Sequence, residues 1–428
     1  MSTQRSPQPT GNVQVLPSAE TSPHRSGFWA AAFAFLIVMA FATLPSPLYG
    51  LYRVRDNLSV ITVTVIYAIF AAGTIATLLS VRFIAARLGR RGIMLAAVAT
   101  MIAGAVVLAA WKDLPGLLIG RLITGVAVGL AAGTAITYLI ELRVRADPNA
   151  SVIRARNIGT AVNVGALGIG PLIAGCLAEW ARLPLTLPYL LWMALGALAL
   201  IGLSAAPETR SPVGQAPARN QARSSSRSVG LLVPAALATL TAFSANGLFA
   251  GLSGLFLATT FGRPSHALAG ATLFLVFTAG VASQLATDRL PAARVFVLGS
   301  VSMLAGLALL VTSVRLATPS LALFLVSGVL IGGGAGAVFK GTTGLVLGAT
   351  APENRLAMTS NLLIALFVGL SIPVIGAGVA LDRGASPPDT VLGFAIVVGL
   401  GVAGAGALLA RALRSAPSTV RIDSEGAT

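Results

Sequence analysis

The sequence predicts an all-α integral membrane protein with twelve transmembrane helices in two six-helix halves. The prediction rests on the composition, on the number of long apolar segments and on an internal repeat. Of the 428 residues, 56% are hydrophobic and only 10% are charged, whereas soluble proteins carry about 25% charged residues. A soluble core cannot use this much apolar sequence, so we expect lipid to surround most of the chain.

Twelve apolar segments are long enough to cross a bilayer, which takes about 20 mostly apolar residues. The predicted spans are residues 27–50, 58–81, 92–111, 114–140, 157–178, 185–205, 230–257, 266–286, 294–314, 318–347, 357–381 and 389–412. These spans define a disordered N-terminal tail (1–26), a first bundle (27–205), a flexible Pro-, Ser- and Arg-rich linker (206–229), a second bundle (230–412) and a C-terminal tail (413–428).

The second half of the sequence repeats features of the first half at a nearly constant distance. Glycines recur every fourth residue in the fourth and tenth spans, 203 residues apart, at Gly125, Gly129, Gly133, Gly328, Gly332 and Gly336. Pro373 follows Pro171 by 202 residues. We expect a duplicated unit whose halves are related by an axis along the membrane normal, with a central cavity between them. The glycine stripes predict close helix packing.

The basic residues indicate the orientation. Of the 29 Lys and Arg residues, twenty fall in the tails and the connections on one side of the predicted bilayer, seven fall on the other side, and Arg121 and Lys340 lie within spans. Cytoplasmic connections carry the excess of positive charge, so we expect both termini in the cytoplasm and the chain in the plasma membrane. The same bias explains the net charge of +16 without nucleic acid as a partner.

Several classes of function lack their sequence signals. The only cysteine is Cys176, and the two histidines, His24 and His266, form no cluster with other ligands, so we expect neither a disulfide nor a metal site. Lys340 lies between Phe339 and Gly341, which does not fit a phosphate-binding loop. We therefore expect no enzyme and no cofactor.

The loop between the second and third spans carries the first motif of a known family. Residues 82–91 read RFIAARLGRR, and the chain resembles the major facilitator superfamily, in particular its bacterial proton-coupled efflux antiporters, over residues 27–412. The family motif is Gly-x-Leu-x-Asp-Arg-x-Gly-Arg-Arg, matched here by Arg87, Gly89, Arg90 and Arg91. The resemblance implies that these residues belong to a cytoplasmic gate; simple topology signalling is the alternative.

The motif departs from the family at its acidic position. Ala86 stands where the family has Asp, which pairs with charges and faces a helix N-terminus; an alanine can do neither. The second half retains Asp288 and Arg289 in the equivalent loop. We therefore expect an asymmetric gate that the second half holds more firmly.

Two further motifs carry the resemblance. Arg121 and Gly125 match the family's Arg-x-x-Gln-Gly motif, with Thr124 in place of Gln, and the resemblance links this arginine to proton coupling. Gly170, Pro171 and Gly175 match most of the fifth-helix motif of antiporters, Gly-Pro-x-x-Gly-Gly. The packing of small residues alone is the alternative for these glycines.

The two cations within spans each leave an alternative open. Arg121 either faces the cavity between the halves or extends along its helix to the outer headgroups. Lys340 either extends to the cytosol or attracts an anionic or zwitterionic substrate. Further candidates for the cavity, each with packing as its alternative, are Tyr67, Asn163, Asn246, Phe249, Phe339 and Asn361. We take Arg121, Asn246 and Lys340 as the substrate and coupling residues.

The sequence shows no acidic residue deep in a span, so the proton site stays open, with Glu141 and Glu179 as candidates. We expect a monomeric secondary transporter that exports a small amphipathic molecule in exchange for protons. The alternatives are a facilitator or symporter for an anionic or zwitterionic metabolite, and a membrane sensor with a degenerate transporter fold.

Overall fold

The computed structural model describes residues 21–209, 226–351 and 354–414, and every regular element in these ranges is a helix. The first half contains α1 (Thr21–Thr43), η1 (Ser46–Leu48), α2 (Tyr49–Asp56), α3 (Val60–Ala110), α4 (Leu114–Ala132), α5 (Ala135–Ala146), α6 (Val152–Trp180) and α7 (Leu187–Ser204). The second half contains α8 (Ser226–Thr259), α9 (His266–Ala286), α10 (Ala292–Arg315), α11 (Leu321–Gly348), α12 (Arg355–Asp382) and α13 (Pro387–Arg414).

The twelve predicted spans are confirmed, because twelve described helical segments are long and apolar enough to cross a membrane. One span combines α1, η1 and α2, another combines α4 and α5, and α3 contains two spans. The structure extends α1 back to Thr21, six residues before the predicted start. The rest of the predicted tails and residues 210–225 of the predicted linker lie outside the described residues.

Serine residues mark where several helices begin. Ser59, Ser151, Ser265 and Ser320 precede α3, α6, α9 and α11, and each hydroxyl accepts a hydrogen bond from the N–H three residues later. This bond satisfies one of the N–H groups that a helix start leaves without a partner. Ser59 and Ser265 occupy equivalent positions in the two halves.

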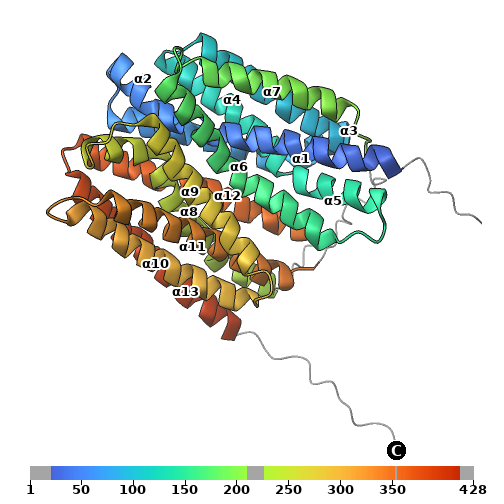
Figure 1. Ribbon diagram of the computed structural model, residues 1–428. Coiled ribbons are helices and arrows are strands. Elements are labelled where there is room, and N and C mark those ends of the chain that lie inside the picture. Colours follow the sequence, from blue (N-terminus) through green and yellow to red (C-terminus); the bar gives the residue numbers. More distant parts are fainter. Residues whose placement is uncertain (1–20, 210–225, 352–353, 415–428) are drawn as a thin grey trace, which may run out of the picture.

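The two halves lie side by side, with α6, α9 and α12 in the middle (Figure 1). Within the first half, α4 packs on α3 where a Cβ at Gly125 would overlap the Phe70 carbonyl oxygen. Within the second half, α11 packs on α9 where a Cβ at Gly332 would overlap the Val276 carbonyl oxygen. The close packing predicted from the glycine stripes is therefore confirmed.

Candidate functional site

The two ends of the bundle differ in charge. We call the end that carries the arginines of residues 87–91, together with Arg154, Arg156 and Arg355, the basic end. We call the other end, where the last residues of α6 and α12 meet the starts of α3 and α9, the opposite end. Contacts between the halves at these ends, and the cavities between them, form the candidate site.

At the opposite end, each half supplies a carboxylate to a helix start of the other half. Glu179, at the end of α6, accepts hydrogen bonds from the N–H groups of His266 (2.7 Å) and Ala267 (3.4 Å) at the start of α9. Asp382, the last residue of α12, accepts the N–H groups of Val60 and Ile61 at the start of α3, both at 2.9 Å. We call these two contacts the cross-half caps. A helix N-terminus carries partial positive charge, so each cap is an electrostatic contact as well as a hydrogen bond.

The cross-half caps are related by the internal repeat. Asp382 follows Glu179 by 203 residues, the distance that separates the glycine stripes. His266 adds a third contact between the halves at this end, because its Nδ1 lies 3.1 Å from the Pro47 carbonyl oxygen. The opposite end is therefore joined by polar contacts that can form and break, in addition to close packing of α6 on the start of α9.

The fifth-helix motif lies at the contact between α6 and α9 and reaches the opposite end, where Gly175 packs on the start of α9. A Cβ at Gly175 would overlap the His266 carbonyl oxygen, and a Cβ at Gly270 would overlap that of Pro171. Gly170 instead faces α1, where a Cβ would overlap the Ala40 carbonyl oxygen. Small residues thus let α6 lie at backbone distance from both halves.

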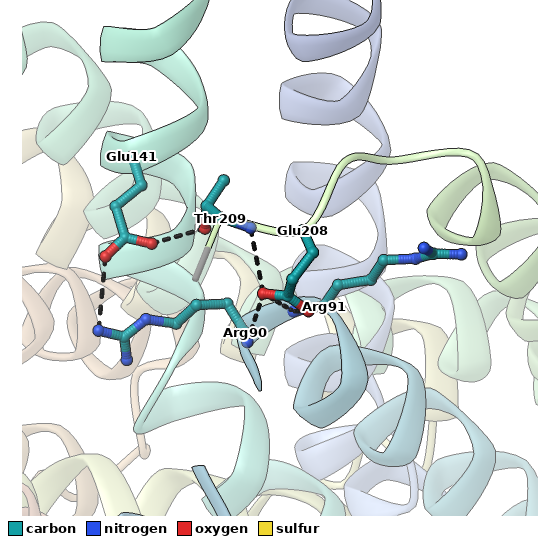
Figure 2. A network of polar contacts seen from close by, with 5 residues as sticks. All are labelled: Arg90, Arg91, Glu141, Glu208 and Thr209. Carbon is teal, nitrogen blue, oxygen red and sulfur yellow. Dashed lines mark hydrogen bonds and ion pairs between the residues drawn. The ribbon is translucent and has the colours of Figure 1, made fainter. Parts of the chain in front are cut away.

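At the basic end, Glu208 binds the motif residues that the sequence predicts to form the first half of a gate. Its carboxylate accepts hydrogen bonds from the backbone N–H groups of Arg90 (2.9 Å), Arg91 (3.2 Å) and Thr209 (3.1 Å). Figure 2 shows that these groups converge on the carboxylate from the α3 backbone and from the chain after α7. Glu208 therefore places a negative charge at the helix start that follows Gly89.

Glu141 extends this network from α5. One of its oxygens lies 3.4 Å from an Arg90 guanidinium nitrogen, and the other accepts the Thr209 hydroxyl at 2.6 Å (Figure 2). Glu141, which is a candidate proton site, therefore also has a structural role. The contacts also attach residues 206–209, the first part of the predicted flexible linker, to the first bundle.

Gly89 is where the two spans of α3 are separated. Its φ of 72° and ψ of 177° belong to a region that is essentially reserved for glycine. A Cβ here would also lie 2.7 Å from Glu208 Oε2, so the missing side chain makes room for the carboxylate. The sequence motif predicted the position of Gly89, and the structure gives the reason for it.

We expect Gly89→Ala to destabilise the protein by about 1–3 kcal/mol, because the new methyl group is strained and displaces Glu208. Thermal unfolding of the detergent-solubilised protein should show a melting temperature lower by a few degrees. Gly404→Ala is the control, since a Cβ there meets nothing within 4 Å. Equal melting temperatures for the two variants would contradict this account of Gly89.

In the second half, Asp288 of the predicted gate contacts Lys340. The Lys340 Nζ lies 3.1 Å from Asp288 Oδ1, and Asp288 Oδ2 accepts the Asn157 amide of the first half at 3.3 Å. The hydrogen bonds from Lys340 and from Asn157 lower the pKa of Asp288. The contact therefore stabilises the fold fully at pH values above the pKa of an ordinary carboxyl group. This stabilisation is lost only as the pH falls through the lowered pKa of Asp288.

Arg121 is buried within the first half, with 1% of its surface exposed. Its guanidinium donates to the carbonyl oxygens of Ala42 (2.6 Å), Tyr67 (3.2 Å) and Ile66 (3.4 Å) and lies 4.7 Å from the centre of the Phe70 ring. The alternative that Arg121 extends to the headgroups is therefore wrong. The side chain links α1, α3 and α4, and Phe70 in turn contacts Phe367 of the second half.

The other predicted residues lie apart from one another. Asn246 is buried in α8, and its Oδ1 has no partner among the described residues. Tyr67 is also buried, with a hydroxyl that lacks a partner there. Arg87, Arg289 and Asn361 are exposed. Arg121, Asn246 and Lys340 therefore do not form one cluster. Of the three, only Lys340 contacts a residue of the predicted gate, Asp288.

Phe249 and Phe339 pack against other aromatic rings. The Phe249 ring lies 5.0 Å from that of Phe324, and the Phe339 ring lies 5.8 Å from that of Phe243. Phe339 also borders a cavity at the basic end. Asn163 of α6 is half-buried. The packing alternative accounts for Phe249 without a substrate.

Among the cavities that the described residues line, one at each end of the bundle borders both halves. The one at the opposite end, of about 290 Å³, has a mainly apolar wall that includes Tyr49, Val63, Leu252 and Leu255. The one at the basic end, of about 480 Å³, is lined by α6, α9, α10, α11 and α12. It contains Lys340 and Asp288, so a predicted gate residue and the predicted substrate cation share one cavity.

Comparisons with known proteins agree with this architecture. Residues 17–150 match the family model described as "Sugar (and other) transporter". The crystal structure of a point mutant of the nucleoside transporter NupG aligns with a TM-score of 0.68 at 13% identity, covering 90% of this chain and 99% of that one. A bacterial homolog of the human lysosomal transporter Spinster, inward-facing and occupied, aligns with a TM-score of 0.67 at 14% identity, covering 92% and 98%. Curated protein sequences give no significant match.

The described helices share the fold of these two solved structures, which are both of transporters. The predicted fold class, the major facilitator fold, is confirmed. The matched family model and both solved structures are of transporters, not enzymes.

Proposed function

We propose that the chain is a secondary transporter that moves a small amphipathic molecule across the plasma membrane by alternating access. The observation that carries this proposal is the pair of cross-half caps. Glu179 and Asp382 join two pseudo-symmetric halves through hydrogen bonds at one end, while the larger cavity lies between the halves at the other end. Halves that rock about a central site need contacts of this reversible kind.

The orientation follows from the charge bias. Cytoplasmic connections are rich in Lys and Arg, so we place the basic end, both termini and the larger cavity on the cytoplasmic side. The cross-half caps then close the outer side. We propose that the protein works as a monomer, because each chain contains both halves of the site.

The proposed direction is export in exchange for protons. The fifth-helix motif of Gly170, Pro171 and Gly175, which resembles that of antiporters, lies at the α6 contacts with both halves. Glu179 and Asp382 are exposed carboxylates on the outer side, so external protons reach them. Protonation removes the charge that attracts each helix start, which would free the outer side to open.

The facilitator or symporter alternative also has an observation in its favour. Among the described residues, no Asp or Glu side chain is buried, whereas Arg121 is. A proton-coupled carrier usually has a titratable group within its spans. If the outer carboxylates do not bind the coupled protons, the described helices contain no other evident proton site.

The experiment that tests the function is accumulation of a chemically mixed panel of compounds in efflux-deficient cells. The cells carry wild type, Arg121→Ala or empty vector, with and without a proton uncoupler. Lower accumulation with wild type alone, reversed by the uncoupler, supports proton-coupled export. Raised accumulation of a compound supports uptake, and unchanged accumulation of every compound supports the sensor alternative.

A further inference from the structure

We infer that the cavity at the basic end binds a small anion that carries a phosphate or carboxylate group. The inference rests on the proposed function in one respect, since it assigns this anion as part of the transported molecule. The site itself is defined by side chains from both halves. Arg156 comes from α6, and Lys340 and Arg355 come from α11 and α12.

The described lining carries more positive than negative charge. Arg156, Lys340 and Arg355 are cationic, and Asp288 is the one acidic residue among the described lining residues. Asp288 already contacts Lys340 and so offsets only one of the three charges. The remaining charge attracts anions into a space of about 480 Å³.

Two buried donors in the same wall lack partners. Gln284 is 6% exposed, and its side-chain Nε2 has no hydrogen-bond partner among the described residues. The Thr343 Oγ1 is likewise buried and without a partner there. Both residues line the cavity. A buried donor without an acceptor destabilises a protein. Because both residues line the cavity, a rotation of either side chain would bring its donor to an anionic oxygen there.

The arrangement favours an anion over a cation or a purely apolar ligand. Cations would be repelled by the three basic side chains, and an apolar ligand would leave the Gln284 and Thr343 donors unsatisfied. An arginine guanidinium matches the two oxygens of a carboxylate or phosphate, while Lys340 supplies a point charge. The headgroup of an anionic lipid has the same chemistry as a soluble anion, so the test must separate the two sources.

The chain provides a specific probe, because Lys112 and Lys340 are its only lysines. Lys112 lies at the opposite end, where its Nζ donates to the Thr186 hydroxyl at 2.8 Å. The full chain in nanodiscs of neutral phosphatidylcholine is treated with an amine-acylating reagent, and modification of each lysine is followed by mass spectrometry. Inorganic phosphate or succinate is added, with tetramethylammonium chloride as the control at equal ionic strength.

We expect phosphate or succinate to slow acylation of Lys340 at least threefold without slowing that of Lys112. Gln284→Leu and Thr343→Val should each raise the half-protecting concentration roughly tenfold, because each removes one hydrogen bond to a charged group. Lys112→Gln is the matched control and should leave protection of Lys340 unchanged. The two wall variants keep every charge, and Gln284→Leu also keeps the Gln284 backbone carbonyl oxygen that accepts a hydrogen bond from Lys340.

Nanodiscs that contain phosphatidylglycerol distinguish the sources. Protection of Lys340 by this lipid alone, with no effect of soluble anions, would support the anion site but assign it to a lipid headgroup. Equal protection of both lysines, protection by the tetramethylammonium salt, or no protection in any arm would overturn the inference. Because this readout needs no transport, anion binding without transport would contradict only the proposed function, whereas transport without protection would contradict only the anion site.

Discussion

The double variant Glu179→Gln with Asp382→Asn is expected to open the end that the cross-half caps hold closed. Each carboxylate at a helix start contributes about 1 kcal/mol when exposed, so losing both should change the equilibrium between closed and open states roughly 30-fold. Spin labels at Leu183→Cys and Thr259→Cys, one on each half, report the separation in a Cys176→Ser background. The distance distribution should shift towards longer values, and acidification of the wild type should shift it the same way.

The control for this experiment is Asp389→Asn. Asp389 lies at the same end and contacts Arg315 at 2.6 Å, but both residues belong to the second half. This variant should leave the distance distribution unchanged. His266 lies beside Glu179 and Arg53 lies beside Asp382, so the variant His266→Gln tests whether the pH response depends on the imidazole rather than on the carboxylates. A double variant that keeps the wild-type distances would contradict the role of the caps.

The second large effect is expected at Arg121. Arg121→Ala removes hydrogen bonds to three carbonyl oxygens and leaves a cavity among α1, α3 and α4. Large-to-small changes at such positions cost about 2–5 kcal/mol. We expect a melting temperature lower by several degrees and loss of transport in the accumulation assay.

Arg121→Lys separates charge from geometry. Lysine keeps the positive charge, but it lacks the planar group that reaches several carbonyl oxygens at once. We expect Arg121→Lys to remain less stable than wild type when measured by differential scanning calorimetry. Its transport should recover only part of what Arg121→Ala loses. Normal expression, stability and transport in Arg121→Ala would show that the buried cation has no role.

The sequence predicted the fold well because lipid imposes a simple rule on it. Backbone polar groups in a bilayer must be hydrogen-bonded within helices. Each apolar segment of sufficient length therefore predicts one spanning helix. The glycine stripes were equally informative, since Gly125 and Gly332 lie where helix backbones meet. The interruptions of spans at residues 44–45 and 133–134 were not predicted, although Pro45 and Pro47 mark the first and Gly133 marks the second.

The contacts of the site were harder to predict because most of them join residues far apart in sequence. Glu208 lies in a stretch whose composition indicates a flexible linker, and its partners Arg90 and Arg91 donate through the backbone, which no side-chain pattern reveals. Gln284 gives no signal either, because its importance comes from burial. The cross-half caps did leave a signal, since Glu179 and Asp382 differ by the repeat distance.

The reciprocity of the caps has a consequence for the origin of the fold. In each cap, one half provides a carboxylate and the other half a helix start, and the second cap exchanges these roles. This is the pattern of an isologous interface, in which residue i of one subunit contacts residue j of its twin and the reverse. A single six-helix ancestor that dimerised with its own copy would have formed both caps from one acidic residue and one helix start, before fusion joined the two copies in one polypeptide.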